Sequence, residues 1–154
     1  MLVEEVKNIL VNHKMNAREL KLELTETVMV DHPENAQKIM RRLIDLGCSL
    51  ALDDYGAGHS GLRHLQRYPL DTLKIDGAFV EPMLASAQSM EIVRSTVALA
   101  HSLGMHVVAE SVETEGVMKK LLEMKCEFGQ GWHFGRPIEL HEVVQRYAKG
   151  QPKT

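Results

Sequence analysis

Short apolar segments and longer amphipathic segments alternate along most of the chain. Five short segments carry apolar residues at alternate positions or as a continuous run, which is typical of strands buried in a sheet. These segments are residues 21–25, 48–53, 72–76 and 105–110, with a weaker one at 126–132. The pattern therefore predicts about five strands.

Apolar residues at helical spacing predict helices between and around these strands. The apolar stripes are Val3, Val6, Ile9 and Leu10; Ile39, Met40, Leu43 and Ile44; Ile92, Val93, Val97, Ala100 and Leu103; and Val117, Leu121 and Leu122. Gly47 and Gly104 follow two of these stripes and predict helix ends, and Thr114 is a suitable N-cap for the last. A short helix from residue 60 and a final helix over 139–147 complete the series.

Strand and helix alternation with short connections predicts an α/β protein with a parallel sheet and outer helices. A doubly wound sheet and a TIM barrel both fit this order of elements. No GxGxxG or GxxxxGK[ST] motif follows a predicted strand, so the usual support for a nucleotide-binding doubly wound sheet is missing. No linker divides the 154 residues, so we expect one domain over 1–150 and a tail over 151–154.

Charged and amide side chains occur toward the carboxyl end of every predicted strand. In residues 21–25, Leu22 and Leu24 share one face, so Glu23 points to the other. The same alternation sets the polar residues of the next two strands opposite their neighbouring apolar residues. The strand-end set is Glu23, Asp53, Asp54, Lys74, Asp76, Glu110 and Gln130.

A capping or solvated role would explain any one of these residues, but their repetition favours a common site. Carboxylates buried together are costly unless cations offset their charge. The carboxyl ends of the strands are also where catalytic residues collect in parallel barrels. Carboxylate ligands without histidine or thiolate favour Mg²⁺ or Mn²⁺, and such cations beside a lysine suit attack of water on a phosphodiester. The residues therefore predict metal-assisted phosphoryl chemistry.

Composition and charge exclude several other functions. The net charge of -3 provides no basic surface for DNA, RNA or an anionic membrane, and no apolar run approaches the roughly 20 residues that span a bilayer. The histidines form no HExxH motif, and Cys48 and Cys126 belong to no CxxC motif. We therefore expect no zinc site, buried free thiols, and a cytoplasmic protein or the cytoplasmic domain of a larger membrane protein.

Five motifs follow the predicted strands in a fixed order. They are Glu-Leu-Thr-Glu at 23–26, Asp-Asp-Tyr-Gly-Ala-Gly at 53–58, Leu-Lys-Ile-Asp at 73–76, Val-Ala-Glu-Ser-Val-Glu-Thr at 108–114 and Gln-Gly-Trp at 130–132. Each motif alone is weak evidence, but together they cover nearly the whole chain. In this combination the sequence resembles the EAL-domain cyclic-di-GMP phosphodiesterases of bacteria.

The resemblance implies a TIM-like (β/α) barrel with one antiparallel strand, of which this chain would form a part. It implies hydrolysis of cyclic di-GMP to the linear dinucleotide pGpG, with two Mg²⁺ or Mn²⁺ ions per complete site. A homodimer is implied as well, with coupling between the metal site and the dimer through the loop at 55–61. Sensor or GGDEF domains are further expected partners in the full-length protein.

The resemblance also assigns roles to the matching residues. Glu23 would ligate the first metal, Asp53 would bridge both, and Asp54 and Glu110 would serve the second. Lys74 would orient the attacking water. The residues expected to support this set are Gln130, Glu26, Glu113 and Asp76, with Glu26 bracing the loop after the aspartate pair.

The sequence departs from the family at several positions. The family usually has phenylalanine at Tyr55, threonine or serine at Ala57, tyrosine at His59, glycine at Ser111 and tyrosine at Trp132. The name-giving glutamate of the family and the asparagine on the following strand have no equivalent before Glu23. Roughly the first three of the eight barrel strands would then be absent from this chain.

Three functions follow as alternatives from these observations. The first is an enzyme domain whose isolated chain is inactive or weakly active because metal ligands are missing. The second is a receptor that binds cyclic di-GMP without cleaving it, and the third is a protein-interaction module. We also expect self-association, because an incomplete barrel leaves two unpaired strand edges.

Overall fold

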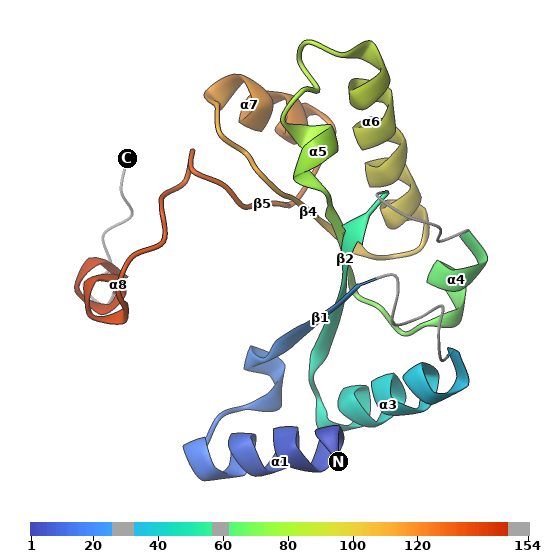
Figure 1. Ribbon diagram of the computed structural model, residues 1–154, viewed down its shortest axis with the longest axis vertical. Coiled ribbons are helices and arrows are strands. Elements are labelled where there is room, and N and C mark those ends of the chain that lie inside the picture. Colours follow the sequence, from blue (N-terminus) through green and yellow to red (C-terminus); the bar gives the residue numbers. More distant parts are fainter. Residues whose placement is uncertain (26–32, 57–61, 148–154) are drawn as a thin grey trace.

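The computed structural model describes residues 1–25, 33–56 and 62–147, and it contains one parallel sheet (Figure 1). The five strands lie side by side in chain order, and every neighbouring pair is parallel. The strands are β1 (Lys21–Thr25), β2 (Ser49–Tyr55), β3 (Thr72–Ile75), β4 (His106–Ala109) and β5 (Phe128–Gly129). The predicted α/β class and the parallel strands are therefore confirmed.

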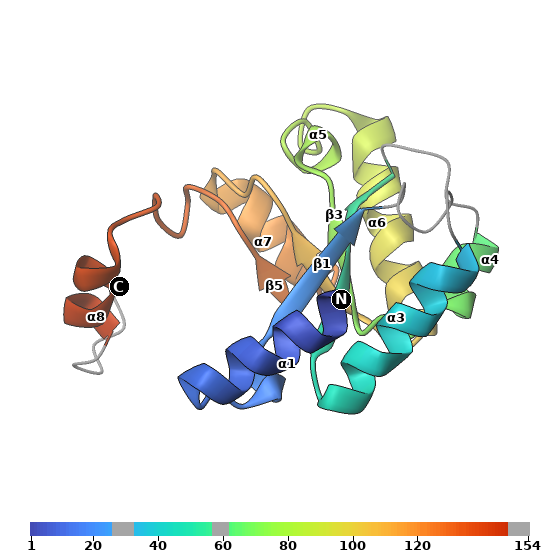
Figure 2. The same ribbon diagram turned by 60° about the horizontal axis from the view of Figure 1, so that its bottom comes forward.

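Helices connect successive strands and cover the sheet. They are α1 (Leu2–His13), the 3₁₀ turn η1 (Ala17–Glu19), α3 (Pro33–Leu46), α4 (Leu62–Arg67), α5 (Gly77–Val80), α6 (Ala87–Ser102), α7 (Glu115–Glu123) and α8 (Leu140–Tyr147). The helices α3, α4 and α6 lie along one side of the sheet, whereas α8 stands apart beyond β5 (Figures 1 and 2). None of the helices in the described residues is long and apolar enough to cross a membrane.

The core lies between the sheet and the covering helices. Leu50, Leu52 and Leu73 are fully buried and belong to the same apolar cluster as Met40 of α3 and Val93 of α6. The other face of the strands is buried as well, since Thr72 and Lys74 are at most 5% exposed. Burial on both faces is what parallel strands of an α/β protein show. It brings polar residues into the interior, where they need partners.

Several element ends differ from the sequence-based expectation. The fifth strand is only the two residues Phe128–Gly129, because the chain turns away at Gly131 against the backbone of Val112. Strand β3 ends at Ile75, and Asp76 instead caps α5 by accepting a hydrogen bond from the Ala78 N–H at 2.9 Å. Helix α5 itself has no apolar periodicity long enough to predict it.

The sheet does not close into a barrel within the described residues, because β1 and β5 pair on one side only. This open arrangement agrees with the expected partial barrel. Cys48 and Cys126 are buried free thiols, as predicted, and burial raises the pKa of both, that of Cys126 to about 11. The tail over 151–154 lies outside the described residues.

Candidate metal centre and adjacent cavity

Lys74 occupies the centre of a cluster of carboxylates at the carboxyl ends of the strands. Its ammonium donates a hydrogen bond to Glu23 Oε2 at 2.8 Å. It also lies 2.7 Å from Asp53 Oδ1 and 2.6 Å from Glu110 Oε1. Strands β1, β2 and β3 and the end of β4 therefore each contribute one charged group to a single point.

Burial of Lys74 is possible only because of these partners. Only 6% of the Lys74 side chain is exposed, which by itself would lower the pKa of its ammonium group. The contacts with Asp53, Glu110 and Glu23 outweigh burial and raise the pKa above the ordinary lysine value. Lys74 is therefore charged at neutral pH and forms ion pairs with these carboxylates.

A β-bulge places two successive aspartates at this centre. Leu52 pairs with Leu73 and Tyr55 with Ile75, so β2 carries one residue more than β3 over this interval. Asp54 lies in this bulge and has a φ of 56°, a left-handed conformation that aspartate tolerates better than most residues. Without the bulge, strand alternation would send the two aspartates to opposite faces.

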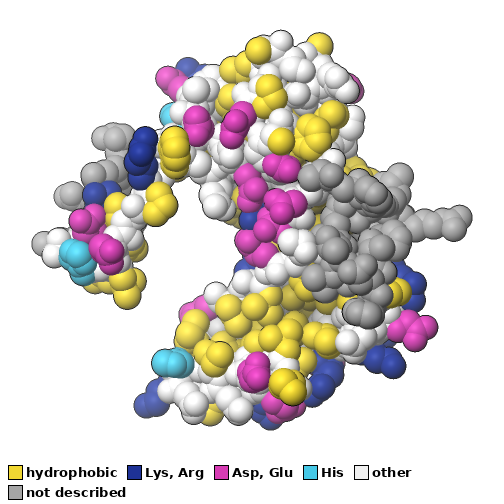
Figure 3. Space-filling view, in the orientation of Figure 1, with side chains coloured by type: hydrophobic (Ala, Val, Ile, Leu, Met, Phe, Trp, Pro, Cys, Tyr) yellow, Lys and Arg dark blue, Asp and Glu magenta, His cyan; other side chains and the backbone are white. Residues whose placement is uncertain are grey.

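These aspartates and Glu110 form the group that suits a cation. Carboxylate oxygens of Asp53, Asp54 and Glu110 all lie within 4.8 Å of one another. The acidic side chains gather in the middle of one face of the molecule (Figure 3). Asp53 Oδ1 is buried and has no aligned hydrogen-bond donor among the described residues, although the Lys74 ammonium pairs with it ionically.

The donor set fits a hard divalent cation. It consists of carboxylate oxygens, of which the buried Asp53 Oδ1 has the Lys74 ammonium as its ionic partner. Glu23 contacts the same ammonium as Asp53 and Glu110, so its carboxylate adds to the same negative field. Asp53, Asp54, Glu110 and Glu23 are the residues that could hold Mg²⁺ or Mn²⁺.

The strand end that carries Glu110 is tightly constrained. The Glu110 N–H donates to the Ile75 carbonyl at 3.1 Å, which extends the β3–β4 pairing by one residue. Ser111 follows with φ 51°, again a left-handed conformation. A Cβ on Gly77 would lie 2.2 Å from Ser111 Oγ, so only glycine allows α5 to approach this turn.

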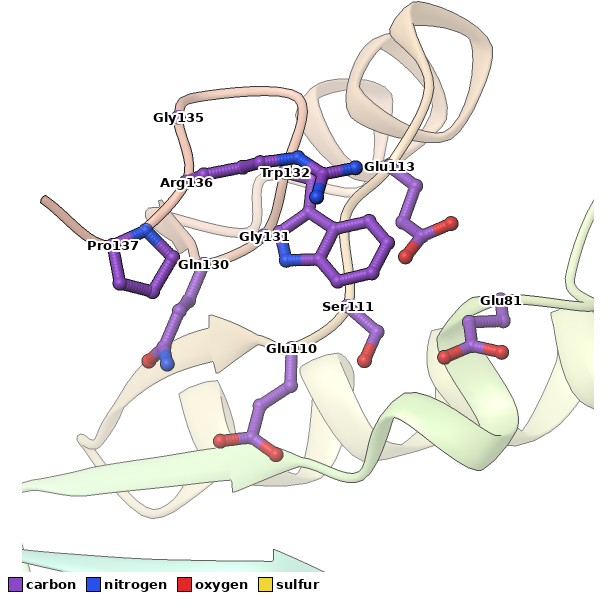
Figure 4. A pocket seen from close by; sticks show the side chains of 10 residues that line it. All are labelled: Glu81, Glu110, Ser111, Glu113, Gln130, Gly131, Trp132, Gly135, Arg136 and Pro137. Carbon is purple, nitrogen blue, oxygen red and sulfur yellow. The ribbon is translucent and has the colours of Figure 1, made fainter.

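Gln130 is brought beside Glu110 by the backbone after β5. The Gln130 N–H donates to the Ala109 carbonyl at 2.8 Å, and its own carbonyl accepts from the Val112 N–H at 3.0 Å. A Cβ on Gly131 would lie 2.3 Å from backbone atoms of Val112, so glycine is needed at this crossing. Gln130 is exposed and its amide faces the same space as the Glu110 carboxylate (Figure 4).

A cavity of about 630 Å³ adjoins the carboxylate cluster. In Figure 4 the Trp132 indole lies between the Arg136 guanidinium and the side chains of Ser111 and Glu110. The guanidinium carbon of Arg136 is 4.4 Å from the centre of the Trp132 ring, which is a cation–π contact. The cavity is lined by Glu81, Glu110, Ser111, Glu113, Gln130, Gly131, Trp132, Gly135, Arg136 and Pro137.

The other residues selected from the sequence are placed as follows. Glu113 lines the cavity, and Asp76 serves as the N-cap of α5 rather than entering the cluster. Glu26 lies outside the described residues, as does most of the 55–61 loop. Sequence reasoning missed Arg136 and Glu81 in the cavity; the Arg-Pro pair at 136–137 after an aromatic segment was the available signal for Arg136.

Comparison with known proteins agrees with this geometry. The family model described as EAL domain matches residues 1–137, so the chain belongs to the EAL domain family. Over 139 residues it is 41% identical to the cyclic di-GMP phosphodiesterase NbdA of Pseudomonas aeruginosa, covering 90% of this chain and 18% of that protein.

Two solved structures show the same fold. The EAL domain of DcpA from Mycobacterium smegmatis matches with a TM-score of 0.91 and 36% identity, over 98% of this chain and 68% of that one. A manganese and cyclic-di-GMP complex of BlrP1 from Klebsiella pneumoniae matches with a TM-score of 0.82 and 33% identity, over 88% of this chain and 34% of that one. The chain spans about a fifth of the length of NbdA and of similar curated relatives.

Proposed function

We propose that this chain supplies the metal-binding and water-orienting side of a site that hydrolyses cyclic di-GMP to pGpG. The observation that carries the proposal is the convergence of Glu23, Asp53 and Glu110 on the Lys74 ammonium at 2.6–2.8 Å. Membership of the EAL domain family, likeness to the cyclic di-GMP phosphodiesterase NbdA and likeness to the manganese and cyclic-di-GMP complex of BlrP1 support the choice of substrate.

Each residue has a part in this hydrolysis. Asp53, Asp54 and Glu110 would hold one divalent cation, and Glu23 together with Asp53 would contribute to a second. Bound Mg²⁺ or Mn²⁺ would neutralise the phosphodiester and lower the pKa of a water molecule. Lys74 orients that water by donating a hydrogen bond to it. Attack at phosphorus breaks the bond to one 3′ oxygen, which leaves a 5′-phosphate and a 3′-hydroxyl on the linear product.

The cavity beside the cluster is suited to part of a nucleotide. Its volume of about 630 Å³ is within the range of small-molecule sites, and the half-exposed Trp132 ring gives it an aromatic wall. Gln130 would hold the substrate or the water network at the boundary between cavity and cluster. Glu113 adds a further carboxylate to the rim.

Two measurements test the proposal together. Formation of pGpG is followed by chromatography with Mn²⁺ or Mg²⁺ and with EDTA. Binding of cyclic di-GMP is followed by fluorescence of Trp132, the one tryptophan of the chain. We expect cation-dependent product and its loss in Asp53→Asn, with the exposed Asp45→Asn as a control of equal charge change.

The same measurements separate the alternatives. Saturable binding that is indifferent to EDTA and gives no product, even after the preceding part of an EAL domain is fused to this chain, would instead indicate a receptor. Absence of both binding and product in that fusion would leave only a protein-interaction module. We further propose a cytoplasmic location and additional signalling domains, sensor or GGDEF, in the same polypeptide.

A further inference from the structure

The cluster at the carboxyl ends of the strands carries more negative than positive charge within a small volume. Among the described residues, Glu23, Asp53 and Glu110 contact the Lys74 ammonium, and the Asp54 carboxylate lies close to those of Asp53 and Glu110, so the cluster holds four carboxylates and one ammonium. Asp53 and Glu110 are only 23% and 20% exposed, so water screens their mutual repulsion incompletely. Without a cation of some kind, this arrangement of strand ends would be electrostatically unfavourable.

Lys74 and a divalent cation depend on the same side chains. Asp53 and Glu110 contact the ammonium directly, and both also belong to the trio whose oxygens lie within 4.8 Å of one another. A divalent cation held by that trio would therefore lie a few ångströms from the buried positive charge of Lys74. The divalent cation and the ammonium would each weaken the interaction of the other with Asp53 and Glu110.

We propose that Lys74 is a built-in counter-ion, which keeps the carboxylates together in the metal-free protein and limits the affinity of the site for divalent cations. This inference rests on the cation site of the proposed function. It gives Lys74 a role that is separate from orienting water, because it concerns the protein before any substrate binds. Removal of the Lys74 charge should therefore have two opposite effects. The metal-free protein should lose stability, and the affinity of the site for divalent cations should rise.

The test compares Lys74→Met with a matched variant, Lys21→Met. Lys21 also has an aspartate partner, Asp71 at 3.1 Å, but it lies at the amino ends of the strands and its side chain is 42% exposed. Both substitutions remove one positive charge and retain an unbranched side chain. Mn²⁺ binding is measured by the loss of the free-ion paramagnetic resonance signal, and thermal stability is measured in EDTA and in millimolar Mn²⁺. No step of this test depends on turnover.

For Lys74→Met we expect Mn²⁺ to bind at least about tenfold more tightly than to the unaltered protein. We also expect its thermal midpoint in EDTA to fall by at least about 5 °C, with recovery on addition of Mn²⁺. Lys74→Arg, which retains the charge, and Lys21→Met should both bind Mn²⁺ within about twofold of the unaltered protein.

Unchanged or weaker Mn²⁺ binding by Lys74→Met would overturn the counter-ion role while leaving the cation site intact. If the variant is unfolded in EDTA, failure of millimolar Mn²⁺ to refold it would overturn the role equally. Absence of Mn²⁺ binding in the unaltered protein and in every variant would overturn the proposed cation site itself, and this inference with it.

Discussion

Lys21 Nζ lies 3.1 Å from Asp71 Oδ1 at the amino end of the sheet, opposite the acidic site. The other oxygen of Asp71 accepts a hydrogen bond from the Leu50 N–H at 2.8 Å. Asp71 therefore ties together the beginnings of β1, β2 and β3. It fixes the register on which the convergence of Glu23 and Asp53 at the opposite end depends.

Asp71→Asn should lower the free energy of unfolding by about 1 kcal/mol at neutral pH, measured by urea denaturation. Burial raises the pKa of Asp71, but its hydrogen bonds with Thr72 and Leu50 and the nearby Lys21 outweigh burial and lower the pKa below the ordinary value. The stabilisation is thus complete above the unfolded pKa, near 4, and is lost as pH falls through the lower folded pKa.

The difference between Asp71→Asn and the unaltered protein should therefore shrink below about pH 4. Asp45→Asn, on the exposed side of α3, provides a comparison with the same chemical change. A constant difference from pH 7 down to pH 3 would show that the charge of Asp71 does not contribute.

Gly131→Ala should destabilise the protein by about 2 kcal/mol or more, because the new Cβ would lie 2.3 Å from Val112 N and Val112 O. The backbone must shift, and Gln130 must move away from Glu110 with it. Gly116→Ala is the control, since its Cβ would meet side-chain atoms alone, a Leu84 methyl at 3.0 Å and the Thr114 hydroxyl at 3.9 Å, and alanine favours the helix. Equal stability of the two variants in urea would contradict the close approach at Gly131.

Ser111→Gly should stabilise the protein by about 1 kcal/mol, because Ser111 adopts φ 51° and glycine has no steric penalty there. Ser111→Ala keeps the Cβ and should bring no such gain. Thermal unfolding of both variants tests the difference. A loss of stability in Ser111→Gly would mean that contacts of the serine side chain outweigh the backbone strain.

The 154-residue chain should hydrolyse cyclic di-GMP far more slowly than a complete EAL domain. Its sheet is open in the described residues, and the carboxylates that could hold the candidate cations come from β1, β2 and the end of β4 alone among those residues. The matching DcpA domain extends beyond this chain, which covers 68% of it. Addition of the preceding part of such a domain, fused or in trans, should increase pGpG formation at least about a hundredfold; full turnover by the chain alone would contradict this.

Self-association is expected from the unpaired sides of β1 and β5 in the described sheet. The exposed apolar side chains Phe128, Leu140 and Val144 near β5 and on α8 add to this tendency. Light scattering at increasing concentration should show a dimer or larger species. A monodisperse monomer over the whole range would contradict the expectation.

The order of strands and helices could be predicted from the sequence, because apolar periodicity directly reflects which face of each element is buried. The leucines of residues 21–25 and 48–53 pack in the core with the helices as predicted, and Glu23 and Asp53 lie at Lys74 on the other face. The candidate site could be predicted for a related reason. In a parallel sheet the carboxyl ends of all strands meet at one edge, so residues such as Glu23 and Glu110 must be neighbours although they are far apart in sequence.

Only the tertiary structure decided how these residues interact. Strand alternation assigns opposite faces to Asp53 and Asp54, and a bulge set by the pairing of β2 with β3 overrides it. The same applies to Asp76, which became a helix cap because β3 ends one residue earlier than its pattern suggests. Contact of Arg136 with Trp132 depends on the turn at Gly131. Local sequence determines which face a residue prefers, whereas bulges, caps and close backbone crossings depend on neighbours that only the folded chain brings together.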